Sequence, residues 1–130
     1  SGKCFEYLGQ CYLRAGKAES ALGCLKKALS LNPKDLILYF KIGDIYLRAG
    51  EPESALEFFD AGLKFNSVDA LLIYKKSSSY ASMKKTPEAL KELALAIGIN
   101  PNIRELALTD LNFEYLFGNS EYRKIVKAKQ

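Results

Sequence analysis

The chain has 130 residues, of which 48% are hydrophobic and 26% are charged, and its net charge is +4. This length and balance suit one folded domain with a continuous core and argue against intrinsic disorder. The basic excess is too small, and its lysines are too scattered among acidic residues, for a face that binds nucleic acid. We therefore expect no nucleic acid as a partner. No apolar run approaches the ~20 residues that cross a bilayer, so we also expect no membrane as a partner of this fragment.

The chain begins with Ser1 and Gly2 instead of a methionine, and we expect it to be a fragment of a longer protein. No signal-peptide pattern opens it. Cys4, Cys11 and Cys24 lack the spacing of a metal site. We expect these thiols to be free and to serve as small buried hydrophobic groups, which is typical of a reducing, cytoplasmic location.

The most informative feature of the sequence is a near repetition. Residues 12–22 return almost unchanged as residues 46–56, thirty-four positions later, and the same shift carries Tyr46 to Tyr80. Self-similarity at a fixed period predicts an array in which each unit buries its apolar face against its neighbours.

The first unit covers residues 2–35, and its pattern predicts two helices. Phe5, Leu8 and Tyr12 fall at i, i+3 and i+7, which indicates one face of a first helix. Gly9 lies on the same face and predicts the close approach of a second helix. A glycine then ends the first helix and an apolar stripe resumes beyond it, so we expect a helical hairpin.

Two further copies follow the first. Residues 36–69 repeat the hairpin, with Gly43 at the position of close approach. Residues 70–103 form a more divergent copy, in which Ser77 replaces that glycine. Thr86 is the predicted N-cap of the last helix of this copy, with a proline just inside the helix.

The same residue types recur at equivalent places of the three copies. The matching positions of the first copy are Phe5, Leu8, Gly9, Tyr12, Ala21, Leu25, Ala28 and Pro33. Those of the second are Tyr39, Ile42, Gly43, Tyr46, Ala55 and Phe59, and those of the third are Ile73, Tyr80, Ala89, Leu93, Ala96 and Pro101. This pattern resembles the tetratricopeptide repeat (TPR) over about residues 2–103, with phenylalanine in place of the first tryptophan. The resemblance implies an all-α fold, a right-handed α-α superhelix (solenoid) of helix-turn-helix repeats.

Residues 104–130 depart from the repeat pattern, and we expect them to form C-terminal capping helices within a single TPR domain. Leu106 is the predicted apolar anchor on the last hairpin, and Tyr122, Ile125 and Val126 share one face of a short final helix. Solenoids need an atypical end that covers the last apolar face. The tail has more aromatic and aliphatic residues than one exposed face needs, so a lid or a dimer surface is an alternative.

The sequence gives no indication of catalysis. Because the chain has no histidine, it cannot build a Ser-His-Asp or Cys-His arrangement. Its glycines fall at helix ends and packing points and form no phosphate loop. We expect no catalytic residue, no cofactor and no metal site, and we expect that the chain is not an enzyme.

On the first helix of each hairpin, a second stripe of residues lies about 100° around the helix from the packed face, and we expect it not to pack against neighbouring helices. In TPR proteins the equivalent stripes line a concave groove that takes an extended peptide or a partner helix. By that resemblance, we expect Phe40 and Tyr74 to be apolar anchors for the bound partner. Alternatively, these two side chains pack between adjacent helices or under the tail. The predicted partner-binding residues are Lys3, Glu6, Gln10, Arg14, Ile37, Phe40, Asp44, Arg48, Leu71, Tyr74 and Ser78.

The resemblance also bears on the kind of partner. Some TPR proteins clamp the C-terminal carboxylate of heat-shock chaperones, but Glu6 and Asp44 would repel a carboxylate at these positions. The related pentatricopeptide repeats, which read RNA, have a period one residue longer. We therefore expect a protein–protein interaction module, an adaptor or scaffold that binds a protein or peptide partner. The alternatives are self-association as a homodimer through the apolar tail and a regulatory domain cut from a larger enzyme.

Overall fold

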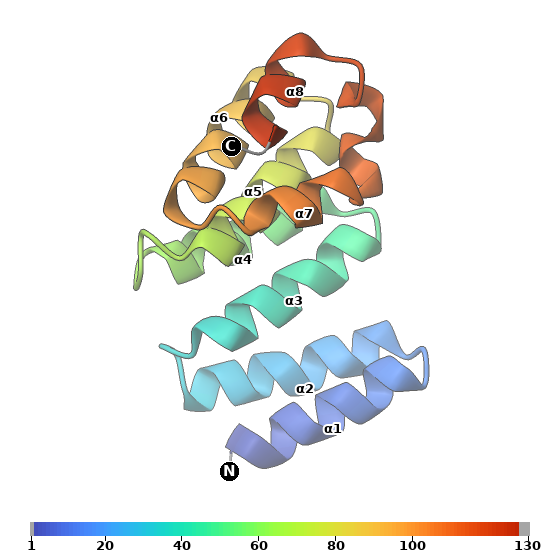
Figure 1. Ribbon diagram of the computed structural model, residues 1–130. Helices are drawn as coiled ribbons and strands as arrows, with labels where there is room; N and C mark the ends of the chain where they lie inside the picture. The colour runs from blue at the N-terminus through green and yellow to red at the C-terminus, as the bar shows by residue number, and fades with distance from the viewer. Residues whose placement is uncertain (1, 128–130) are drawn as a thin grey trace. The chain divides into compact units, whose positions relative to one another are not determined.

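The computed structural model describes residues 2–127 of the chain. Over this range the chain contains eight α-helices, one 3-10 helix and no strand (Figure 1). The chain divides into two compact units, which we name the N-terminal unit (Ser1–Phe65) and the C-terminal unit (Asn66–Gln130).

The N-terminal unit consists of two helical hairpins. Gly16 and Gly50 lie in their tight turns with φ values of 77° and 80°, a left-handed conformation that glycine adopts without a steric penalty. The repeated glycine therefore sets the turn of each hairpin. The helices are α1 (Gly2–Arg14), α2 (Ala18–Leu31), α3 (Leu36–Arg48) and α4 (Pro52–Leu63).

The core of the N-terminal unit forms between α2 and α3, with α1 packed on it. Small and large apolar residues alternate on the buried face of α2, which lets neighbouring helices approach closely. The partly buried side chains of Phe5 and Tyr12 bring α1 onto this cluster. The buried residues of the cluster are Ala21, Leu25, Ala28, Leu38, Ile42 and Ile45.

The two glycines predicted at helix contacts lie where the sequence places them. A Cβ added at Gly9 would be 3.0 Å from Cγ of Leu25, and one added at Gly43 would overlap the ring of Phe59. Both positions are buried. The glycines therefore allow the first helix of each hairpin to contact the second.

The C-terminal unit contains a third hairpin followed by three short helices. In its turn Lys84 has a φ of 60°, where the first two hairpins have glycine. The hairpin consists of α5 (Ala70–Ser82) and α6 (Thr86–Ile99). The remaining helices are α7 (Ile103–Leu108), the 3-10 helix η1 (Leu111–Leu116) and α8 (Ser120–Val126).

The six hairpin helices lie within the predicted repeats 2–35, 36–69 and 70–103. The predicted cap, residues 104–130, covers most of α7 and all of η1 and α8. Its last residues, 128–130, lie outside the described part of the chain. The assignment of all of these segments to a single domain stays a prediction.

The aromatic residues of the tail contribute to the core of the C-terminal unit. Phe113 and Tyr122 are fully buried, and their ring centroids are 5.8 Å apart. The Tyr122 hydroxyl donates a hydrogen bond of 3.0 Å to the carbonyl oxygen of Ala107. Burial raises the pKa of Tyr122, and the nearby carboxylate of Asp110 adds to this effect. These contacts join η1 and α8 to α7.

Two details predicted for the C-terminal unit are wrong. Leu106 is 44% exposed, because α7 turns Ile103 and Ala107, one helical turn apart, into the core instead. Thr86 is the first residue of α6 and not its N-cap, which is Lys85. The Thr86 hydroxyl lies 3.0 Å from the hydroxyl of Tyr115 on η1.

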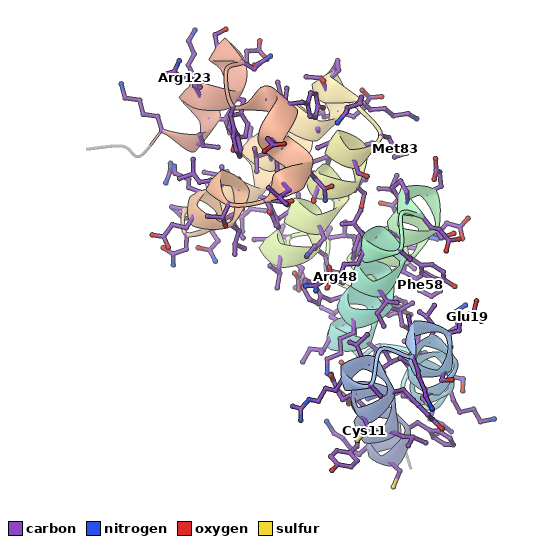
Figure 2. All side chains as sticks on the ribbon, turned by 90° about the vertical axis from the view of Figure 1, so that its right-hand side faces the viewer. Cys11, Glu19, Arg48, Phe58, Met83 and Arg123 are labelled. Carbon is purple, nitrogen blue, oxygen red and sulfur yellow. The ribbon has the colours of Figure 1, made fainter. Side chains whose placement is uncertain are left out.

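The expected burial of the cysteines is also wrong for two of the three. Cys4 and Cys11 are exposed, and Cys24 is half-buried; Figure 2 shows Cys11 at the surface of α1. Cys4 and Cys11 each precede a core-facing aromatic residue by one position, which places them about 100° around the helix from the packed face. Within residues 2–127, every helix falls short of the length and apolar character that a bilayer crossing requires.

Candidate functional site

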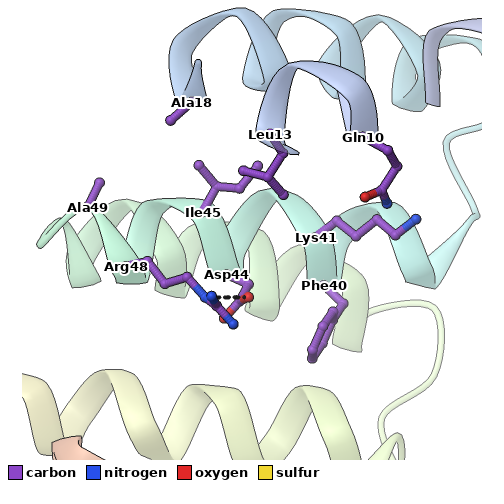
Figure 3. A pocket seen from close by; sticks show the side chains of 9 residues that line it. All are labelled: Gln10, Leu13, Ala18, Phe40, Lys41, Asp44, Ile45, Arg48 and Ala49. Carbon is purple, nitrogen blue, oxygen red and sulfur yellow. Dashed lines mark hydrogen bonds and ion pairs between the residues drawn. The ribbon is translucent and has the colours of Figure 1, made fainter. Parts of the chain in front are cut away.

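A pocket of about 520 Å³ opens in the N-terminal unit. Gln10 and Leu13 reach it from α1, whereas most of the other side chains come from α3 (Figure 3). The pocket therefore lies between the first helices of two successive hairpins. Its lining residues are Gln10, Leu13, Ala18, Phe40, Lys41, Asp44, Ile45, Arg48 and Ala49.

Three of the pocket residues on α3 share one face of the helix. The side chain of Asp35 accepts a hydrogen bond of 3.0 Å from the backbone N–H of Ile37, which caps the helix. Phe40, Asp44 and Arg48 follow at intervals of four residues and therefore share one face of α3. This face lines the pocket.

An ion pair joins α1 to α3 beside the pocket. Nζ of Lys41 donates a hydrogen bond of 3.0 Å to Oε2 of Glu6, and Nζ of Lys3 lies 3.6 Å from Oε1. The hydrogen bond from Lys41 and the two positive charges hold the pKa of Glu6 below its ordinary value, against the opposing effect of partial burial. The pair thus links the side chains of the two helices that form the pocket.

A second ion pair lies on the rim of the pocket. Nε of Arg48 donates a hydrogen bond of 3.0 Å to Oδ2 of Asp44 (Figure 3). The side chain of Asp44 is 17% exposed and that of Arg48 is 79% exposed. The guanidinium group therefore faces solvent, and its N–H groups outside this bond suit carbonyl or carboxylate oxygens.

The pocket combines this polar rim with an apolar interior. Ile45 is buried, Phe40 is half-buried and Leu13 is exposed, so the apolar surface extends from the core to the outside. Gln10 adds an amide that can both donate and accept a hydrogen bond. Apolar walls with a few placed polar groups are typical of binding sites.

The pocket includes only part of the predicted site in the N-terminal unit. Gln10, Phe40, Asp44 and Arg48 line it. Glu6 lies beside it as the ion-pair partner of Lys41. Three predicted residues, Lys3, Arg14 and Ile37, are exposed and lie outside the lining.

The predicted site residues of the C-terminal unit have a different environment. Leu71 is exposed, but Tyr74 is 3% and Ser78 1% exposed. Both hydroxyls donate hydrogen bonds to Oδ2 of Asp110, at 2.5 Å from Tyr74 and 2.8 Å from Ser78. The expectation that packing leaves these two positions free is wrong, because the tail covers them. A role of these residues in binding a partner stays a prediction.

Sequence reasoning missed several residues of both regions. Leu13 is three residues beyond Gln10 and belongs to the predicted second stripe of the first repeat, although the predicted partner-binding residues did not include it. Lys41 and Ile45 could not have been predicted as pocket residues from helical spacing, because their position in the pocket depends on how α1 lies against α3. Asp110 is recognisable as a helix cap before the aromatic run of the tail, but its contact with Tyr74 joins residues 36 positions apart.

Comparison with known proteins identifies the repeat. Residues 8–70, just under half of the chain, match the family model described as tetratricopeptide repeat. A search of curated proteins gave no significant match. The matched segment covers the predicted second repeat and most of the first.

Solved structures share the fold over almost the whole chain. MamA is 23% identical, with a TM-score of 0.79 over 98% of this chain and 75% of that one. The first TPR of Spaghetti (RPAP3), bound to the HSP90 peptide SRMEEVD, is 18% identical, with a TM-score of 0.73 over 95% and 89%. YrrB, a TPR protein with an unusual peptide-binding site, is 16% identical, with a TM-score of 0.73 over 96% and 65%.

These identities are low, so the structural likeness establishes the fold and nothing more specific. The fold is the one predicted from the period of thirty-four residues, and the all-α prediction is confirmed. Residues 8–70 of the chain match the tetratricopeptide repeat family, and the chain has the fold of helix-turn-helix repeats that these solved structures share.

Proposed function

We propose that the chain is a protein–protein interaction module that binds a peptide or helix of a partner protein and performs no chemistry of its own. The observation that carries this proposal is the pocket between α1 and α3, with its apolar interior and the exposed Arg48 on its rim. Its volume of about 520 Å³ lies within the usual range of binding pockets.

The residues of the pocket suit different parts of a partner. Phe40 and Leu13 offer apolar surface to a large apolar side chain, and aromatic residues are frequent energetic centres of interfaces. Arg48 offers N–H groups to backbone carbonyl or carboxylate oxygens, and Gln10 offers its amide. Because these residues project from helices joined by the Lys41–Glu6 bond, binding requires little rearrangement.

The likeness to two peptide-binding structures supports the same proposal. One neighbour is a TPR domain solved with a bound HSP90 peptide, and another is described as having an unusual peptide-binding site. These descriptions concern those proteins. For the present chain they make a peptide or a helix the first class of partner to test.

Affinity capture with matched variants tests the proposal. The wild-type chain and the variants Phe40→Glu, Arg48→Glu and Leu31→Glu are each immobilised and exposed to a lysate of the source organism. Leu31 is exposed at the end of α2 and lies outside the pocket, so Leu31→Glu is the control for an added surface charge. We expect partners retained by the wild type and the control to be lost from both pocket variants.

The result that contradicts the proposal is equal retention by all four proteins, provided that circular dichroism shows each variant to be folded. Partners that are lost only from Arg48→Glu would indicate an electrostatic contact without insertion into the pocket. That outcome would also contradict the role given to Phe40.

Self-association is the second candidate, and exposed apolar residues of the C-terminal unit favour it. Leu108 and Leu111 are exposed, as is Phe117. Apolar residues of this size are frequent in contacts between identical subunits. Light scattering over a range of concentrations separates the two candidates, because the average molar mass of a protein that forms a homodimer rises with concentration. The variant Leu111→Glu should prevent this rise.

A further inference from the structure

The tail of the C-terminal unit places a carboxylate on the face of α5 where the sequence predicts partner binding. Tyr74 and Ser78 are four residues apart and therefore share a face of α5. Their hydroxyls donate hydrogen bonds of 2.5 Å and 2.8 Å to the same oxygen, Oδ2 of Asp110. Oδ1 of Asp110 accepts a third bond, of 2.9 Å, from the backbone N–H of Asn112.

The side chains of Asn112 and Phe113 extend this contact. Nδ2 of Asn112 donates a hydrogen bond of 3.0 Å to Oγ of Ser78. Phe113 is fully buried, and its ring centroid lies 6.1 Å from that of Tyr74. Residues 110–113 therefore contact α5 through an acid, an amide and an aromatic ring within four positions.

These contacts are of the kind that a bound peptide makes. The carboxylate accepts hydrogen bonds from neutral hydroxyl groups, so α5 recognises an acid through the geometry of two donors. The ring of Phe113 supplies buried apolar area next to this polar contact, which is the arrangement of an anchor residue in an interface.

We propose that the Tyr74–Ser78 face of α5 is a second recognition site, whose ligand is a segment with an acidic residue followed three positions later by an aromatic one. Residues 110–113 of the chain occupy this site as an internal ligand. A partner segment of the same chemistry binds when the internal segment is released. The inference rests on the proposed function as a binding module and adds a partner class and a site to it.

The internal segment has a large advantage over any free peptide. A short connection gives a tethered ligand an effective concentration on the order of millimolar. A free peptide at micromolar concentration is therefore excluded from the wild-type chain. Weakening the internal contact without removing the tail should open the site.

The test measures binding of a fluorescent peptide with the sequence of residues 109–117 by fluorescence anisotropy. The proteins are the wild-type chain, the double variant Asp110→Ala/Phe113→Leu, and this double variant with Ser78→Ala added. We expect the double variant to bind the peptide at least about tenfold more tightly than the wild type. Adding Ser78→Ala, or changing the aspartate of the peptide to asparagine, should reverse this gain.

Two results would overturn the inference. One is a folded double variant that binds the peptide no better than the wild type, and the other is equal binding of the aspartate and asparagine peptides. If circular dichroism shows that the double variant is unfolded, the isosteric Asp110→Asn decides in its place, with the same two outcomes. It removes the charge and keeps Phe113.

A further variant separates this inference from the proposed function. Phe40→Glu lies in the N-terminal unit and should leave peptide binding to the double variant unchanged, although it should abolish capture of partners by the wild type. Failure of the peptide test with intact capture would refute only the α5 site. Failure of capture with intact peptide binding would refute only the α1–α3 pocket.

Discussion

Gly43 lies at a close contact between α3 and α4. A Cβ at this position would overlap the ring of Phe59, which is fully buried and cannot move aside without disturbing the core. Gly23 is the matched control, because it lies on the exposed face of α2 with no atom within 4 Å of an added Cβ.

We therefore expect alanine to have opposite effects at these two glycines. Gly43→Ala should lower the free energy of unfolding by about 1–3 kcal/mol, the usual cost of overpacking a core. Gly23→Ala should raise it by about 0.5–1 kcal/mol, since alanine loses less backbone entropy in a helix. Urea denaturation measures both changes, and a loss of stability in Gly23→Ala would contradict this account of α2.

The third hairpin shows how a repeat can lose its glycines and keep its fold. Ser77 replaces the close-approach glycine, and its hydroxyl donates a hydrogen bond of 2.6 Å to the carbonyl oxygen of Ala89 on α6. Lys84 replaces the turn glycine with a φ of 60°, and its ammonium group lies 4.2 Å from the ring centroid of Tyr115. The sequence reveals both departures from the repeat, but their compensating contacts depend on the packed structure.

At the scale of elements, the bond between Lys41 and Glu6 joins α1 to α3 and makes their association depend on pH. Because Lys41 lowers the pKa of Glu6, the folded state favours the ionised carboxylate. The contribution of this pair is present above the ordinary glutamate pKa of about 4.3. It is lost as the pH falls through the lower pKa of the folded state.

We expect the wild type to lose more stability than Glu6→Gln when the pH falls from about 5 to about 3. Urea denaturation at several pH values measures the difference, with the exposed Glu19→Gln as the control. Parallel losses in the wild type and Glu6→Gln would show that the bond between α1 and α3 contributes nothing to stability in solution.

The tail shows why its buried residues were harder to predict than its helices. Phe113 and Leu116 are buried, whereas Leu111 is exposed. η1 is a 3-10 helix with about three residues per turn, so residues at i and i+3 share a face. An α-helical period would also place Phe117, four residues beyond Phe113, on the buried face, whereas Phe117 is exposed. The change of pattern after residue 103 was sufficient to predict a helical tail that does not follow the repeat.

At the scale of the whole molecule, the period of thirty-four residues was sufficient to predict the fold. Tyr12, Tyr46 and Tyr80 keep the phase of three hairpins, and the helices follow it. The candidate sites were harder to predict from the sequence, because they depend on contacts between elements far apart in the chain. Lys41 pairs with Glu6 across 35 positions and Tyr74 with Asp110 across 36. The helical period gives the face of a residue but not the element that covers it.

The uneven burial of the helices predicts the order in which the chain opens. α1 buries only Gly9 among its 13 residues, and Tyr7 and Leu8 are exposed, although Leu8 belongs to the predicted apolar face. α5 has the same length and buries seven residues. In a repeat array each helix is stabilised mainly by its neighbours, so a helix with little buried surface opens at a low free energy.

We therefore expect hydrogen exchange in the native state to begin in α1. Its amides should exchange with a lower opening free energy than those of α5, although both helices have complete backbone hydrogen bonding within their interiors. Mass spectrometry of peptides from the two helices, corrected for intrinsic exchange rates, measures the difference. Equal protection would contradict this order, because it would mean that α1 opens only when the more deeply buried helices open as well.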